Sequence, residues 1–162
     1  MNNLAKKTEK GQSLLEALAV VAVIGIVVLG LVMGLSTSLK NTRLTKEQNS
    51  AQSYAQGASE WLIYWKEKNW DAFFEKAGVT GTPLFYCLNE LPSDDTAFDS
   101  WTDGSCGSTY ILALDGTDTI YQREVSLEQK AVKEIEAVTT VSWTSPEVDN
   151  EISLTLSLTD WK

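Results

Sequence analysis

The chain has no histidine, and its 162 residues include only three prolines and two cysteines. Histidine is the commonest general base and the commonest metal ligand in proteins, so its absence removes the simplest catalytic and metal-binding arrangements. The sequence also shows no Ser/His/Asp set, no glycine-rich phosphate loop and no cluster of metal ligands. We therefore expect a protein that is not an enzyme and that needs no cofactor and no metal.

Basic residues are scarce as well. The chain has 13 lysines and arginines against 22 aspartates and glutamates, which gives a formal net charge of −9 at pH 7. Proteins that bind nucleic acid directly present a basic surface to the phosphates. We therefore expect no direct contact with nucleic acid.

Proline and charge are both missing from a long N-terminal stretch. No proline precedes Pro83, and the 23 residues from Ala17 to Leu39 carry no charge. A helix of this length covers about 35 Å, enough to cross a hydrocarbon core of about 30 Å. The pattern predicts a transmembrane segment at about residues 14–39. Glu16 lies at its edge, and because a carboxylate is costly in a membrane, we expect it to have a partner.

A short basic leader meets this apolar run at Lys10-Gly11-Gln12-Ser13-Leu14-Leu15-Glu16. The junction resembles the class III signal of type IV pilins and of type II secretion pseudopilins. In that family a prepilin peptidase cleaves after the glycine and methylates the new N-terminus. The resemblance implies a cleaved leader of residues 1–11, methylation at Gln12, and an assembly role for Glu16, which would neutralise the N-terminal ammonium of a neighbouring subunit.

Two features of this segment bear on that resemblance. The family most often has phenylalanine or methionine where Gln12 stands, and an N-terminal glutamine can cyclise, which would remove the ammonium. Many major pilins have a proline at the position of Met33, so its absence favours a minor pilin or a pseudopilin. Removing a leader that carries three lysines and one glutamate would take the formal net charge from −9 to −11.

Other membrane-targeting interpretations stay open. An ordinary secretory signal peptide could be cleaved near Gly34-Leu35-Ser36, although the apolar run exceeds the usual length of about 7 to 15 residues. The run could also be a simple uncleaved anchor. With an uncleaved anchor, the chain could be a membrane-anchored adhesin or sensor head that keeps its leader and never polymerises.

The predicted helix continues well beyond the apolar run. Small and apolar residues recur there at a spacing of three and four, which is typical of one helix face: Leu44, Ala51, Tyr54, Ala55, Ala58, Trp61, Leu62 and Trp65. We expect a single helix over residues 12–77, ended by Gly78 and the Gly81-Thr82-Pro83 stretch. Within its first half, Gly25, Gly30 and Gly34 are candidates for close packing against other helices.

A second resemblance covers the distal part of this helix. The segments Tyr54-Ala55-Gln56-Gly57-Ala58-Ser59-Glu60-Trp61 and Lys66-Glu67-Lys68-Asn69-Trp70 are similar to an Ala-x-Gly-x-x-Glu and basic-x-x-Asn-Trp stretch of some bacterial minor pilins. Aromatic residues at helical spacing usually belong to a core, so we favour plain amphipathic packing in which these tryptophans cover a sheet.

Residues 78–162 have the pattern of a small β head. Strict alternation over Ile152–Leu158 and weaker alternation over Ile135–Trp143 predict two antiparallel strands. A hairpin between residues 109–114 and 119–125 completes an expected sheet of about four strands. The fold class is therefore α+β, a long N-terminal helix packed on a small antiparallel sheet. The C-terminal strands, which close on Leu-Thr-Asp-Trp, also resemble those of minor pilins and I-type minor pseudopilins.

The head also holds both cysteines and an acidic segment. A disulfide between Cys87 and Cys106 is expected in an exported protein and would contribute about 3 kcal/mol, while two free thiols are the alternative. Four aspartates follow the first cysteine closely: Asp94, Asp95, Asp99 and Asp103. Their spacing fits no EF-hand loop, so we interpret them as a solvated loop rather than a calcium site.

Taken together, these patterns favour a structural subunit of a type IV pilus-like filament. The family resemblance implies four kinds of partner, namely other pilin or pseudopilin subunits, prepilin peptidase, the inner-membrane assembly platform, and membrane lipid before assembly. It also implies a single-pass protein of the cytoplasmic membrane, with the head outside, that later enters a cell-surface or periplasmic filament.

Overall fold

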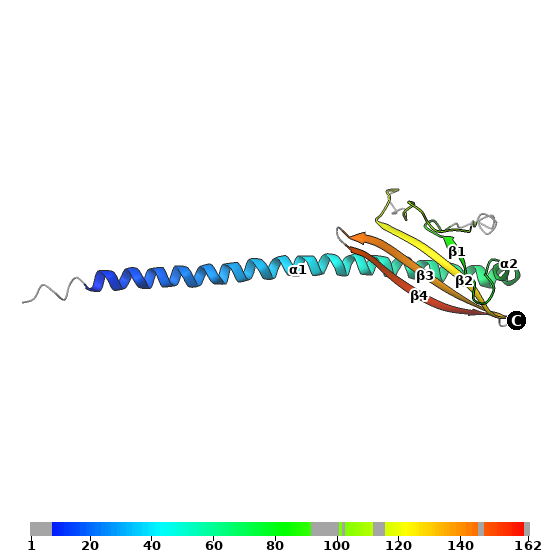
Figure 1. Cartoon of the computed structure of the whole chain (residues 1–162), viewed down its shortest axis with the longest axis horizontal. Helices are drawn as coiled ribbons and strands as arrows, with labels where there is room; N and C mark the ends of the chain where they lie inside the picture. The colour runs from blue at the N-terminus through cyan, green and yellow to red at the C-terminus, as the bar shows by residue number, and fades with distance from the viewer. Residues whose placement is uncertain (1–7, 92–100, 102, 112–115, 146–147, 161–162) are drawn as a thin grey trace, which may run out of the picture. The chain divides into compact units, whose positions relative to one another are not determined.

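The computed structural model describes residues 8–91, 101, 103–111, 116–145 and 148–160. Its elements are two helices, α1 (Thr8–Lys68) and α2 (Trp70–Glu75), and four strands, β1 (Leu84–Cys87), β2 (Tyr121–Ala131), β3 (Glu134–Ser145) and β4 (Val148–Thr159) (Figure 1). The predicted α+β fold, a long N-terminal helix with a small antiparallel sheet, is confirmed. The chain divides into two compact units, one up to Lys46 and one from Glu47 onward.

The helix ends earlier than the sequence pattern predicts. The prediction of one helix over residues 12–77 was wrong, because α1 ends at Lys68 and a separate short helix follows. Asn69 interrupts the helical path with extended backbone angles, φ −152° and ψ 90°, and its side-chain oxygen accepts a hydrogen bond from the Ala72 amide at 3.2 Å. Asn69 is thus the N-cap of α2, a role that asparagine fills well.

The sheet is a simple antiparallel meander in the order β1-β2-β3-β4. Its two C-terminal strands confirm the alternation seen in the sequence: Ile135 lies opposite Leu158, and Val141 lies opposite Ile152. The β3–β4 register covers all 12 residues from Glu134 to Ser145 without a shift. The connection between these strands is shorter than the predicted loop of residues 144–150, since β3 ends at Ser145 and β4 begins at Val148.

The predicted hairpin of residues 109–125 is only partly correct. Ile111 does form backbone hydrogen bonds with the second segment of the predicted hairpin. Its amide donates to the Tyr121 carbonyl at 2.8 Å, and its carbonyl accepts from the Thr119 amide at 2.9 Å. However, residues 109–111 form no strand, and β2 runs from Tyr121 to Ala131, six residues beyond the predicted end. Residues 112–115 lie outside the described part of the chain.

The core of the second unit lies between the sheet and the distal half of α1 (Figure 1). One cluster joins Leu62 and Trp65 of α1 to Phe73 of α2 and to Val125, Leu127 and Ile135 of the sheet. A second cluster joins Ala51 and Ala55 to Tyr121, Val141 and Trp143. The tryptophans of the helix do cover the sheet as expected, with Trp65 buried and with Trp61 and Trp70 packed against the first cluster.

Candidate assembly segment

The N-terminal half of α1 exposes a continuous apolar surface. Its large aliphatic side chains from Leu14 to Leu39 are between about half and three quarters exposed, and none of the most apolar 18-residue window is buried. That window has a mean hydropathy of 3.0, so the helix is long and apolar enough to cross a membrane. Burying this surface in lipid or against other chains would be strongly favourable.

Structural features of the segment suit an apolar environment. Ser36 and Thr37 donate their hydroxyl groups to the carbonyls of Val32 and Met33, one turn earlier, at 3.0 Å and 3.1 Å. These internal hydrogen bonds satisfy groups that would otherwise be costly away from water. The hydroxyls of Ser36 and Thr37 therefore do not prevent transfer of this part of the helix into lipid.

Glu16 and the expected cleavage site all lie within α1. Gly11 and Gln12 fall near the beginning of the helix, and Glu16 follows one turn later with an exposed side chain. The neighbouring Leu14, Leu15 and Leu18 are 63% to 71% exposed, so the carboxylate is part of the apolar surface. Processing at Gly11 and pairing by Glu16 stay predictions.

The three glycines expected to pack closely against other helices have open space around them in this structure. A methyl group added at Gly25, Gly30 or Gly34 would meet no heavy atom within 4 Å. Contacts of the described residues therefore set no requirement for glycine at these positions, whereas close packing against other helices would set one.

Comparison with known families bears directly on this segment. Residues 6–32 match the prokaryotic N-terminal methylation motif. The chain carries a prepilin-type signal. This match confirms the class III signal read from the sequence, and it agrees with the type IV pilin and pseudopilin family. No curated protein and no solved structure matches the chain. The prepilin motif implies processing and assembly with pilin-type subunits, and together with the apolar helix it points to membrane anchoring.

The head of this prepilin-type chain is held to α1 by a buried arginine that the sequence analysis did not identify. Arg123 on β2 is only 4% exposed. Its guanidinium donates to the carbonyls of Leu88 at 2.6 Å, Tyr54 at 2.9 Å and Asn89 at 3.2 Å. Burial lowers the pKa of Arg123 to about 10, so the side chain stays charged at neutral pH. One cation thus ties α1 to the segment after β1 and to the sheet.

Glu47 forms a second attachment between helix and sheet. Its carboxylate accepts a hydrogen bond from the Ser145 hydroxyl at 2.8 Å, and its backbone carbonyl accepts one from the Tyr121 hydroxyl at 3.1 Å. Glu47 is buried, with 8% of its surface exposed. The first turn of the second unit is therefore fixed to the ends of both β2 and β3.

The structure pairs Cys87, at the end of β1, with Cys106 in a disulfide whose Cα atoms are 4.6 Å apart.

Of the four aspartates considered above, only Asp103 is in the described part of the chain. It forms an isolated antiparallel bridge with Tyr86. Burial, with added effects of Asp103, raises the pKa of Tyr86 to about 12, and the Tyr86 hydroxyl donates to the Lys76 carbonyl at 2.6 Å. Asp94, Asp95 and Asp99 lie outside the described residues.

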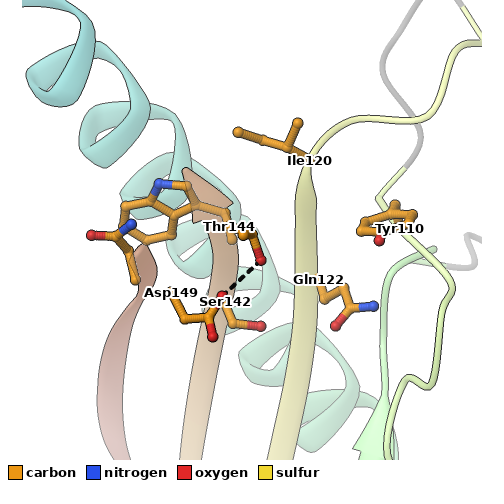
Figure 2. A pocket seen from close by; sticks show the side chains of 8 residues that line it. Tyr110, Ile120, Gln122, Ser142, Thr144 and Asp149 are labelled. Atoms are coloured by element: carbon orange, nitrogen blue, oxygen red, sulfur yellow. Dashed lines mark hydrogen bonds between the residues drawn. The ribbon is translucent and has the colours of Figure 1, made fainter. Parts of the chain in front are cut away.

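A shallow pocket of about 240 Å³ lies at one end of the sheet (Figure 2). The described residues that line it include a single carboxylate, Asp149, which accepts a hydrogen bond from the Thr144 hydroxyl at 2.9 Å. Its remaining lining is neutral: Tyr110, Ile120, Gln122, Ser142, Trp143 and Asn150. Among the described residues, no group of three or more His, Cys, Asp or Glu side chains could hold a metal ion.

Proposed function

We propose that the chain is a structural subunit, a minor pilin or a pseudopilin, of a type IV pilus-like filament, and that it has no enzymatic activity and needs no cofactor. The observation that carries this proposal is the combination of a methylation motif with a helix whose apolar half is exposed throughout. The head forms two core clusters of its own, whereas the apolar half of α1 has no described residue of the chain to bury it. The segment would rest in lipid before assembly and pack against other helices afterwards.

The processing steps follow from the position of the motif. Prepilin peptidase would remove residues 1–11, which leaves Gln12 as the methylated N-terminus and Glu16 as the fifth residue of the mature chain. The carboxylate of Glu16 would then pair with the terminal ammonium of a neighbouring subunit. Two opposite charges that pair in a low dielectric offset part of each other's desolvation cost, whereas either alone would be expensive there.

Three parts of the mature protein have distinct roles in this proposal. Residues 14–39 anchor the chain in the cytoplasmic membrane and later join the filament, with Gly25, Gly30 and Gly34 allowing close approach. The distal half of α1 supports the head of residues 78–162, which lies outside the membrane. The Cys87–Cys106 disulfide suits such an oxidising compartment. The assembly platform of the inner membrane would deliver the subunit to a cell-surface or periplasmic filament, without direct contact with nucleic acid.

Mass spectrometry of the N-terminal peptide from bacterial membranes tests this proposal. We expect the mature chain to begin at Gln12 and to carry one methyl group there. A Gly11→Val variant should keep its leader, because cleavage follows the glycine, whereas Gly25→Ala should be processed normally. An unprocessed Met1 terminus in the parent chain would favour the anchored adhesin or sensor instead. A terminus beyond Ser36 would indicate an ordinary signal peptide, and either result would contradict the proposal.

A further inference from the structure

Strand β4 is a long, unprotected edge of the sheet. It pairs with β3 over its full length of 12 residues, and in the described part of the chain no strand pairs with its other side. The opposite edge, β1, is short and partly covered. It has four residues, its Tyr86 forms a bridge with Asp103, and its Phe85 carbonyl accepts a hydrogen bond from the Gly104 amide at 2.9 Å. Of the strands that the structure describes, only β4 therefore leaves a row of backbone groups for another strand.

From Ile152 onward, β4 lacks the usual devices that protect such an edge. Natural edge strands are commonly interrupted by proline, by a bulge or by charged residues, lysine above all. Between Val148 and Thr159 there is no proline, glycine, lysine or arginine, and the eight residues from Ile152 to Thr159 carry no charge. The β3–β4 register also contains no bulge. This edge is thus free to accept a further strand.

The inward face of β4 is incompletely covered. Leu154 points to the same face as Thr139 of β3, its register partner, yet Leu154 is 38% exposed and Thr139 is 1% exposed. The flanking Ile152 and Leu156 are only half-buried. An added strand with apolar residues at alternate positions would extend this face and cover it.

Charge indicates what kind of strand would fit. Asp149 and Glu151 are exposed at the beginning of β4, on the outward face of the sheet. The same face carries four more carboxylates, on Glu124, Glu128, Glu134 and Glu136, against the single ammonium group of Lys130. With a net charge of −9, a second copy of this chain would bring like charge to an acidic face.

We propose that β4 binds an extended strand of a different, less acidic polypeptide by β-augmentation. The incoming strand runs antiparallel to β4, presents apolar residues at alternate positions beside Ile152, Leu154 and Leu156, and carries basic residues where it meets Asp149 and Glu151. Backbone hydrogen bonds along the edge supply affinity, while the apolar face and the charges supply selectivity. This binding goes beyond filament assembly and does not depend on it.

The test uses the full-length protein in lipid nanodiscs and fluorescent ten-residue peptides as probes. The first peptide alternates valine with threonine and ends in two lysines, which lie beside Asp149 and Glu151 in the antiparallel arrangement. A second peptide has the same composition as the first but has its valines grouped together. A third peptide keeps the alternation of the first but ends in two glutamates in place of the two lysines. We expect saturable binding of the first by fluorescence anisotropy, with affinity about tenfold weaker for each of the others, because they lose the alternation or the charge match.

Matched variants locate the binding site. Leu154→Lys places a charge on the inward side of the edge and should weaken the first peptide about tenfold or more. Val138→Lys introduces the same charge on the interior strand β3 and should leave binding unchanged. Equal binding of the first and second peptides, or equal effects of the two variants, would overturn the proposal. So would disulfide cross-linking of two Thr155→Cys chains to each other, since a second copy would then occupy the edge.

Discussion

Two charged residues of this chain, Arg123 and Glu16, lie in opposite environments. Arg123 is buried, but it donates to three carbonyl groups supplied by α1 and by the segment after β1. Glu16 is exposed on an apolar helix surface. The sequence makes Glu16 visible because no charge follows it for 23 residues. It cannot reveal Arg123, whose partners lie 34 to 69 residues away and are backbone atoms.

Substitution of Glu16 tests the proposed pairing in the filament. We expect Glu16→Ala to be processed like the parent chain but to enter filaments several-fold less, because the neighbouring ammonium would lose its partner in a low dielectric. Sheared filaments and membranes can be compared by immunoblotting to measure this. Glu60→Ala is the matched control, since it removes an exposed carboxylate from the same helix outside the apolar run. Parental incorporation of Glu16→Ala would contradict the pairing role.

At the scale of the elements, apolar periodicity in the sequence predicts those helices and strands that bury one apolar face. The strands β3 and β4 are evident from their alternation, because one face is buried and the other faces solvent. After Leu127 the next inward position of β2 is the polar Gln129, so the apolar alternation ends there and the C-terminal half of the strand was missed. The end of α1 was also missed, because Asn69 acts there through its capping hydrogen bond and not through hydrophobicity.

Gly78 lies in the connection between α2 and β1, where the backbone packs too closely for any side chain. Its amide donates to the Leu127 carbonyl at 3.0 Å, and a methyl group on its Cα would collide with the backbone of Thr82 and Leu84. We expect Gly78→Ala to lower the free energy of unfolding by about 3 kcal/mol, since backbone atoms must move. Denaturant unfolding measures this loss.

The control for Gly78 lies in the helix that supports the head. A methyl group at Gly57 of α1 would meet nothing within 4 Å. Gly57→Ala should therefore stabilise the protein by about 0.5 to 1 kcal/mol through its higher helix propensity. Loss of stability of similar size in both variants would show that the close approach at Gly78 is not the cause.

At the scale of the whole molecule, the two compact units differ in where their stability comes from. The unit from Glu47 onward buries two clusters of its own side chains, to which α1 contributes Ala51, Ala55, Leu62 and Trp65. In the apolar segment before it, none of the most apolar 18-residue window is buried by the described residues. Its hydrophobic surface therefore contributes to anchoring and assembly, and the free energy of folding of the head should not depend on it.

Truncation separates these two contributions. We expect a fragment of residues 47–162 to be soluble in water and to unfold cooperatively, with a midpoint within about 5 °C of the full-length protein in detergent, because every helix residue in both core clusters is retained. A fragment of residues 70–162 lacks Leu62 and Trp65 and should not fold, since the sheet would lose the helix that covers it. Thermal unfolding followed by near-UV circular dichroism distinguishes the two fragments. Failure of the longer fragment to fold would mean that the apolar segment stabilises the head, whereas cooperative folding of the shorter one would mean that the distal half of α1 does not.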